Sequence, residues 1–241
     1  MEFKKLKIII LSTDTLHHRY FINTLKKSKI KIHKYVFETT SVKPKFKEKN
    51  FFKKEENIFE KKNFFKKISK SMDEKKVIKL KNINSNKSLK TLKNLKMDLG
   101  IVFGCRKINQ NIIDQFKYGL INIHRGVIQK YRGLDSDLWA ILKKDFKNIG
   151  VCLHLIDKNL DTGAIIQQKK IKIKKNMKIF HMKYLTTLLA TQMTIDLLKK
   201  RSKNFKFLKK QKKLGSYYSF MPYNEKNNAK IIFDQYVKKL K

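Results

Sequence analysis

Lys7-Ile8-Ile9-Ile10-Leu11 is a short apolar run, and the turn residues Ser12-Thr13-Asp14-Thr15 follow it directly. An apolar run of this length predicts a buried parallel strand, and the polar residues after it are typical helix caps. Residues 17–27 then have helical spacing, and residues 32–37 predict a second strand. A strand, a helix and a strand in this order predict the start of a doubly wound α/β domain.

The same alternation continues toward the C-terminus. Further strands are predicted at residues 77–80, 99–104, 120–124, 151–156 and 164–173. Further helices are predicted at residues 85–96, 112–116 and 137–144, with a long amphipathic helix at 177–201 and a last helix at 229–240. The sequence therefore predicts a Rossmann-like α/β fold with a doubly wound, mostly parallel sheet over residues 1–175, followed by a helical C-terminal extension over residues 176–241.

Residues 40–74 interrupt this pattern. Lys and Glu dominate the segment, and Phe pairs occur at positions 51–52 and 64–65. We interpret the segment as a basic, solvated and partly helical insertion. The alternative is a flap or partner surface formed by exposed aromatic side chains.

The net charge of the chain is +40, and of its 59 basic residues 54 are Lys and five are Arg. Proteins that grip phosphates favour Arg, because its planar guanidinium binds them through two parallel hydrogen bonds. The chain is also rich in Asn, Ile and Phe and has only two Pro, as an A/T-rich genome would favour. We therefore attribute the charge to genome composition, and nucleic-acid or anionic-membrane binding is the alternative.

Other features of the sequence limit where the protein acts. It has no apolar run of about eighteen residues, which argues against a membrane span. Its N-terminus lacks the apolar core and cleavage site of a signal peptide. Cys105 and Cys152 form neither a disulfide framework nor a metal-binding spacing. We expect a cytoplasmic protein without a bound metal.

Three polar residues lie at the sheet edge where open α/β folds bind ligands. Asn122 and His124 end a predicted strand, and their spacing of two residues puts both side chains on one face. Asp161 lies in a loop between two predicted strands and precedes Thr162-Gly163, where the chain must turn. An amide, an imidazole and a carboxylate are therefore expected to meet at this edge.

Four motifs follow one another in this half of the chain. They are Leu120-Ile121-Asn122-Ile123-His124, Lys130-Tyr131-Arg132-Gly133, Gly150-Val151 with His154, and Leu160-Asp161-Thr162-Gly163-Ala164-Ile165-Ile166 with Gln168. Together they resemble the folate-dependent formyltransferase family over about residues 97–170. Within this family, residues 13–18 and 131–137 are most similar in sequence to the nucleotide-sugar N-formyltransferases.

The resemblance implies an enzyme that uses 10-formyltetrahydrofolate as co-substrate and needs no metal. The family's catalytic Asn, His and Asp fall on Asn122, His124 and Asp161. The amide and a protonated imidazole can donate hydrogen bonds to the oxyanion that forms when an amine attacks the formyl carbon. Asp161 is expected to favour the imidazolium and to hold its orientation. The residues implied to form the folate pocket are Phe103, Gly104, Cys105, Arg106, Lys107, Ile156, Asp157 and Leu160.

Two departures from the family concern the amine acceptor. After the catalytic His the family usually has Pro-Ser-Leu-Leu-Pro, whereas this chain has Arg125-Gly126-Val127-Ile128-Gln129. Arg125 is therefore predicted to bind an anionic acceptor. The first turn, which contains Thr13, lacks the glycines of a phosphate-binding loop. Thr13 and His154 are the other residues predicted to lie near the acceptor.

These departures favour a small-molecule acceptor, the amino group of a nucleotide-linked sugar, over glycinamide ribonucleotide or tRNA. Methionyl-tRNA formyltransferase is the first alternative. A formyltetrahydrofolate hydrolase and a non-catalytic basic binding module on the same fold are the others. The resemblance also implies that two copies pair through C-terminal elements as a homodimer.

Overall fold

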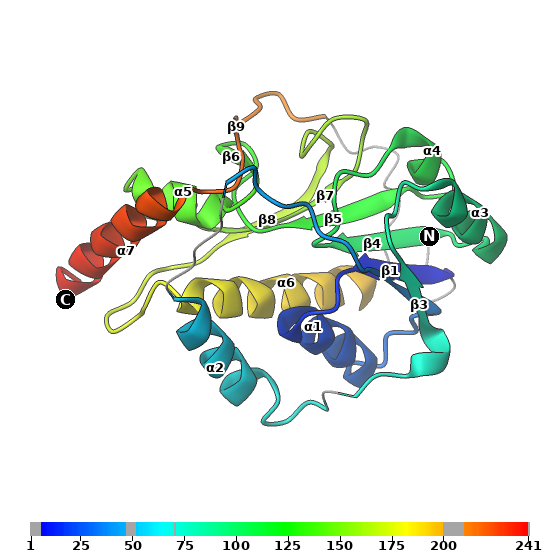
Figure 1. Cartoon of the computed structure of the whole chain (residues 1–241), viewed down its shortest axis with the longest axis horizontal. Coiled ribbons are helices and arrows are strands. Elements are labelled where there is room, and N and C mark those ends of the chain that lie inside the picture. The colour runs from blue at the N-terminus through cyan, green and yellow to red at the C-terminus, as the bar shows by residue number, and fades with distance from the viewer. Residues whose placement is uncertain (1–5, 47–51, 70, 200–209, 241) are drawn as a thin grey trace.

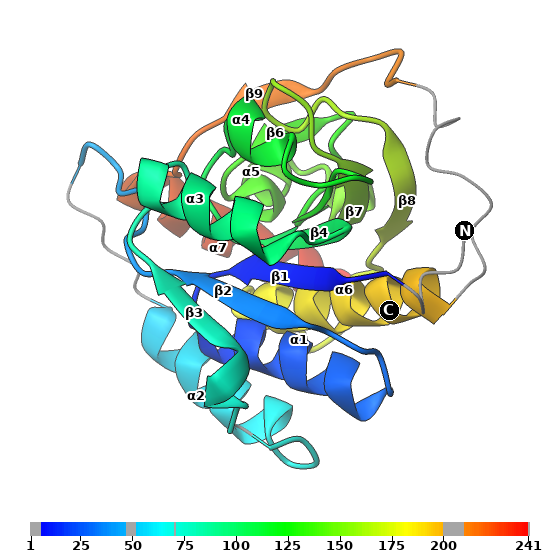
Figure 2. The same ribbon diagram turned by 90° about the vertical axis from the view of Figure 1, so that its right-hand side faces the viewer.

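The computed structural model describes residues 6–46, 52–69, 71–199 and 210–240. A seven-stranded sheet forms the centre of the fold, and helices cover both of its faces (Figures 1 and 2). The strand order is β3-β2-β1-β4-β5-β7-β8. The first five strands run parallel, β7 runs antiparallel to β5, and β8 runs antiparallel to β7. The predicted doubly wound, mostly parallel sheet is therefore confirmed.

Each predicted strand has a counterpart within a few residues. The strands are β1 Ile8–Ser12, β2 Lys34–Glu38, β3 Val77–Leu80, β4 Leu99–Phe103, β5 Leu120–His124, β6 Tyr131–Gly133, β7 Gly150–Leu155, β8 Ile165–Lys170 and β9 Ser216–Tyr218. The helices are α1 Leu16–Lys27, α2 Lys53–Phe64, α3 Asn86–Leu95, α4 Gln110–Ile113, α5 Ser136–Leu142, α6 His181–Lys199 and α7 Tyr223–Lys238, with short 3₁₀ helices η2 Glu74–Lys76 and η3 Phe146–Asn148. The strands that the sequence did not predict, β6 and β9, pair in parallel with each other in a small second sheet.

The two faces of the sheet are both apolar, which explains the continuous apolar run of β1. Its residues alternate between two clusters: Ile8 and Ile10 pack on the side of α1 and α6, whereas Ile9 and Leu11 pack on the side of α3 and α4. Successive side chains of a strand point to opposite faces, so a strand covered on both sides reads as uninterrupted apolar sequence. Figure 2 shows the resulting three layers.

Helix α6 packs directly on the sheet, although it falls within the predicted C-terminal extension. Ala190 and Met193 on α6 share the apolar cluster that contains Ile8 and Ile10 of β1. Its buried side also carries threonines, and the hydroxyl of Thr187, for example, donates to the carbonyl of Lys183 at 2.7 Å. Because these hydroxyl groups are hydrogen-bonded to backbone carbonyls of the same helix, threonines can lie on the buried side. The separation of apolar and polar faces is therefore weaker than the sequence suggested. The domain boundary at residue 175 stays a prediction.

The solvated interpretation of residues 40–74 is wrong for the inner face of α2. This helix packs against α1 and α6, where Phe64 stacks on Tyr20 at 4.5 Å between ring centroids and lies 4.8 Å from the ring of Tyr184. Glu60 on the same face has an exposed fraction of only 1%. Among the Phe residues in the described part of this segment, Phe52 and Phe64 are buried, whereas Phe46 is 40% exposed. Position 51 lies outside the described residues.

The C-terminal helix α7 packs against α5 in a separate apolar cluster with β6 (Figure 1). None of the described helices is both long and apolar enough to cross a membrane.

We expect Phe233→Ala to lower the free energy of unfolding by about 3–5 kcal/mol, because Phe233 of α7 is fully buried in this cluster. The matched control is Ile231→Ala on the same helix, where the side chain is 47% exposed and the cost should stay below about 1 kcal/mol. Urea unfolding of both variants measures the difference. Equal losses would show that α7 does not pack as described.

Candidate functional site

An amide, an imidazole and a carboxylate meet at the carboxyl end of β5, as the sequence predicts. The carboxylate of Asp161 lies 3.3 Å from Nδ1 of His124 through Oδ2, and its Oδ1 accepts a hydrogen bond from the Asn122 amide at 3.2 Å. Asn122 and His124 reach the same carboxylate because they point to the same face of β5. The three side chains form one cluster, which a hydrogen bond and a close charge contact join.

The loop that carries Asp161 is held in a strained conformation. Asp161 has a φ of 53°, in the left-handed region that few residues other than Gly adopt. The backbone N–H of Gly133 donates to Oδ2 of Asp161 at 2.8 Å, and the side chain of Gln211 donates to its backbone carbonyl at 3.2 Å. The sharp turn predicted here is present, and it is centred on the carboxylate-bearing residue itself. A strained conformation of this kind persists where several surrounding contacts hold it in place.

Burial and charge set the protonation of this cluster. Burial alone would raise the pKa of Asp161, but the adjacent His124 and His154 and the N–H of Gly133 lower it below its usual range. Burial lowers the pKa of His124, and this outweighs the opposite effect of the Asp161 charge. The resting cluster therefore pairs a carboxylate with a neutral imidazole. The charge of Asp161 does favour the imidazolium, as the sequence predicts, but burial has the larger effect on the pKa of His124.

The environment of His124 nonetheless suits a transient positive charge. Besides Nδ1 against Asp161, its Nε2 lies 2.9 Å from the backbone carbonyl of Tyr131. Both ring nitrogens thus face acceptor oxygens, and a doubly protonated ring satisfies both of them. A proton gained during a reaction would be stabilised on His124.

His154 lies behind the cluster. It is paired with Asn122 across the antiparallel β5–β7 ladder, and its Nε2 lies 3.2 Å from the amide of Asn122 and 3.3 Å from Oδ1 of Asp161. The side chain is buried and belongs to the wall of a small cavity beside the cluster. It is therefore placed to orient Asn122 and Asp161.

A cavity of about 520 Å³ opens beside the cluster, beyond the carboxyl ends of β1, β2, β4 and β5. The predicted site residues that line it are Thr13, Phe103, Gly104, Cys105, Arg106, Lys107, Asn122, His124, Arg125, Leu160 and Asp161. A second cavity of about 50 Å³ adjoins it, and its walls include Cys105, Arg106, Lys107, Asn122, His154, Ile156, Asp157, Leu160 and Asp161. The structure therefore brings all of the predicted site residues together around two connected hollows.

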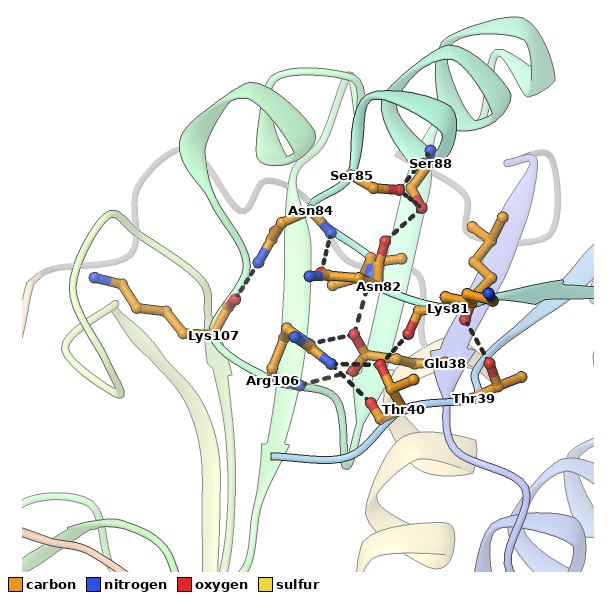
Figure 3. Close-up of polar contacts among 12 residues, drawn as sticks. Glu38, Thr39, Thr40, Lys81, Asn82, Asn84, Ser85, Ser88, Arg106 and Lys107 are labelled. Carbon is orange, nitrogen blue, oxygen red and sulfur yellow. Dashed lines mark hydrogen bonds and ion pairs between the residues drawn. The ribbon is translucent and has the colours of Figure 1, made fainter. Parts of the chain in front are cut away.

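The loop after β4 is tied to the end of β2 by a buried ion pair (Figure 3). The carboxylate of Glu38 accepts hydrogen bonds from both the side chain and the backbone N–H of Arg106, and from the backbone N–H of Ile83 at 3.0 Å. The Arg106 guanidinium also donates to the carbonyl and hydroxyl of Thr40 at 2.8 and 2.9 Å. A further hydrogen bond joins Asn84 to the carbonyl of Lys107 at 2.9 Å. This network fixes the cavity wall that Arg106 and Lys107 form.

Two adjacent histidines of α1 form part of the cavity wall, and the sequence analysis did not select them. His18 accepts or donates at Nδ1 to the hydroxyl of Thr13 at 2.9 Å, and its ring lies 4.7 Å from that of Phe103. A Cβ atom at Gly104, which has a φ of 83°, would come within 2.5 Å of this ring. The glycine that ends β4 therefore makes room for His18. Glu38, His17 and Asp137 also line the cavity without having been predicted.

We expect the protein to lose stability as the pH falls below about 6.5, because burial lowers the pKa of His17 and His18 well below that value. The unfolded chain then binds more protons than the folded one, so the free energy of unfolding decreases with falling pH. Each ring should contribute about 1.4 kcal/mol per pH unit. Urea unfolding at pH 7.5 and 5.5 measures this, and His17→Gln and His18→Gln should each reduce the pH dependence. An unchanged pH dependence in both variants would contradict the assignment.

Across the described ranges, no group of three or more His, Cys, Asp or Glu side chains is placed to hold a metal ion.

Comparisons with known proteins agree on one family. The family model described as Formyl transferase matches residues 6–193. A methionyl-tRNA formyltransferase from Borrelia garinii subsp. bavariensis is 30% identical over 140 residues, which are 58% of this chain and 44% of that protein. The matched stretch is thus less than half of that relative's length.

Solved structures of formyltransferases share the fold. A sugar N-formyltransferase from a Shewanella species has a TM-score of 0.60 at 13% identity, with 95% of this chain and 87% of that chain covered. A 4-N formyltransferase from Francisella tularensis has a TM-score of 0.62 at 17% identity, with 94% and 87% covered. At such low identities the likeness concerns the arrangement of helices and strands.

Proposed function

The chain belongs to the formyl transferase family, and from this membership we propose that it transfers a formyl group from 10-formyltetrahydrofolate to the amino group of a nucleotide-linked sugar. The observation that carries the proposal is the cluster of Asn122, His124 and Asp161 at the wall of the larger cavity. These are the residue types on which the family's chemistry depends, joined here by contacts of 3.2 and 3.3 Å.

The reaction balances with one proton transfer. The acceptor nitrogen forms a bond to the formyl carbon, the bond from that carbon to the donor nitrogen breaks, and a proton passes from the acceptor amine to the donor nitrogen. In this proposal the Asn122 amide donates a hydrogen bond to the oxygen that becomes negative, which is usually the largest kind of stabilisation in acyl transfer. In this proposal His124 takes up the amine proton, and Asp161, whose Oδ2 lies 3.3 Å from its Nδ1, stabilises the imidazolium that results.

The residues around the smaller cavity combine apolar and polar groups, as binding of the formyl donor requires. Val102, Ile108 and Ile156 provide apolar surface beside the polar residues Asn122 and His154. A flat heterocycle needs apolar faces and a few fixed polar groups, which is how most small-molecule sites are built. We place the donor between the loops at residues 103–108 and 156–161, next to Asn122. The donor supplies the activated formyl group.

We expect Glu38→Gln to raise the KM for 10-formyltetrahydrofolate by about tenfold, because the loss of a charge-assisted hydrogen bond to Arg106 loosens the loop at the donor site. Glu38 touches no reacting atom in this proposal, so the KM for the acceptor and kcat should change much less. Steady-state kinetics with each substrate varied in turn separates these effects. Glu55→Gln, on the exposed side of α2, is the matched control. An equal change in all constants would indicate general misfolding.

Methionyl-tRNA is the second candidate acceptor, because the curated relative from Borrelia garinii subsp. bavariensis bears the name methionyl-tRNA formyltransferase. The deciding experiment incubates the protein and 10-formyltetrahydrofolate with a panel of amino-sugar nucleotides and with methionyl-tRNA. Mass spectrometry then detects the gain of one carbonyl group. Formylation of methionyl-tRNA alone would overturn the sugar assignment.

The remaining alternative is a basic module without catalysis. It predicts no formyl transfer to any acceptor and nucleic-acid binding that weakens steeply with salt. Filter binding of tRNA between about 50 and 200 mM salt tests this, and transfer activity in the same preparation would exclude the alternative.

A further inference from the structure

Arg125 lies at the inner end of the larger cavity with an incomplete set of hydrogen bonds. Its guanidinium lies over the ring of Phe103, 5.1 Å from the centroid, and donates to the hydroxyl of Thr187 at 3.2 Å. Its Nε is buried and has no hydrogen-bond partner within the described residues. A buried donor without an acceptor is costly. Because Arg125 as a whole is only partly buried and lines the cavity, its other N–H groups can meet a ligand there.

Carboxylates balance the charge of this guanidinium. Asp137 lines the same cavity, and Glu60 lies behind it, with Oε2 at 3.9 Å from Nδ1 of His17. The electrostatic effect of both carboxylates reaches Arg125. A third carboxylate, that of Glu56, is matched by the ammonium of Lys183 at 2.8 Å. These carboxylates offset positive charge at the inner end, although burial raises the pKa of Asp137 to about 6 and that of Glu60 above its usual range.

Burial also disfavours the charged form of the two imidazoles beside Arg125. His17 and His18 are buried, and burial lowers the pKa of both well below the ordinary value. They offer nitrogen atoms that donate or accept hydrogen bonds, next to the hydroxyl of Thr13. The surface at this end is thus rich in hydrogen-bonding groups and nearly neutral.

Free positive charge lies instead at the rim of the cavity. Lys107 lines the cavity and is exposed, and Lys43 is exposed directly after Ser41 and Val42, which line it from the other side. Neither lysine has a carboxylate partner among the ion pairs of the described residues. Positive charge that no carboxylate balances attracts phosphate groups.

We propose that Arg125 and Asp137 select the acceptor by binding its uncharged, hydroxyl-bearing ring at the inner end, while its phosphates lie at the rim formed by Lys43 and Lys107. This inference rests on the proposed function. A hydroxyl group accepts a hydrogen bond from Arg125 and donates one to Asp137, so it satisfies both side chains. A phosphate only accepts, and at this place it would face the carboxylates of Asp137 and Glu60. This assignment differs from the sequence-based prediction that Arg125 binds an anionic group, which stays a prediction.

The first test compares two acceptors: the amino-sugar nucleotide that the wild type formylates, and the same amino sugar without its nucleotide. Arg125→Gln and Asp137→Asn should each lower kcat/KM at least about tenfold with both acceptors, because the lost contact is with the ring. The KM for 10-formyltetrahydrofolate should not change. Arg19→Gln and Asp234→Asn, which lie away from the cavity, are the matched controls. A loss confined to the nucleotide-linked acceptor would overturn the proposal.

The second test measures binding and does not depend on turnover. Isothermal titration with inorganic pyrophosphate and with UDP should give the same affinity for the wild type and Arg125→Gln, and a weaker affinity for Lys43→Gln, which lies outside the donor loop. Loss of pyrophosphate binding in Arg125→Gln would show that Arg125 holds phosphate, which contradicts the proposal. If the wild type formylates no sugar nucleotide, the proposed function fails, whereas this titration still decides the position of the phosphates.

Discussion

His124→Ala should slow formyl transfer by about 10²–10⁴-fold, the usual contribution of a positioned general base. His124 is the imidazole that faces Asp161 at 3.3 Å, and both of its ring nitrogens have acceptor oxygens that stabilise the protonated form. Without it, the amine proton has no side-chain acceptor in the cluster other than Asp161, whose lowered pKa makes it a poor base. Single-turnover transfer, followed by the mass gain of the acceptor, measures the loss.

The control for this variant is His181→Ala, which changes a partly exposed histidine at the start of α6. It should keep nearly full activity. Urea unfolding of both variants separates a catalytic loss from a folding defect. If His124→Ala retains wild-type activity with every acceptor that the wild type accepts, His124 has no role in catalysis.

Asn122→Ala should lower kcat by about 10²–10³-fold with little change in either KM, because its amide is proposed to contact only the charge that develops during the reaction. The structure gives this amide a fixed direction, since it is held between Asp161 and His154 at 3.2 Å from each. Steady-state kinetics on Asn122→Ala measures the effect, and Asn111→Ala on the exposed surface of α4 is the matched control.

A rise in KM without a fall in kcat would contradict this role, because it would place Asn122 in ground-state binding. The double variant of Asn122 and His124 adds a further check. Since both residues act on one transition state through Asp161, its loss should be smaller than the product of the two single losses.

The sequence predicted where the site lies, but it did not predict all of the residues that line the cavity. Asn122 and His124 could be found because they end an apolar strand with a spacing of two residues, and Asp161 because a turn follows it. Glu38 also ends a strand, and that position was the available signal for it. Its partner Arg106 lies 68 residues away, however, and no local pattern links the two.

The apolar runs of β1 and β4 predicted the sheet by themselves, because a strand that is covered on both faces is largely apolar. Only the tertiary structure decided that α2 turns Glu60 inward, that β6 pairs with β9, and that carboxylates surround Arg125. These features depend on contacts between segments that are far apart in the chain, such as the 62 residues between Arg125 and Thr187. Hydrophobic periodicity reports which face of an element is buried, whereas the charge around a buried side chain depends on which distant elements pack against it.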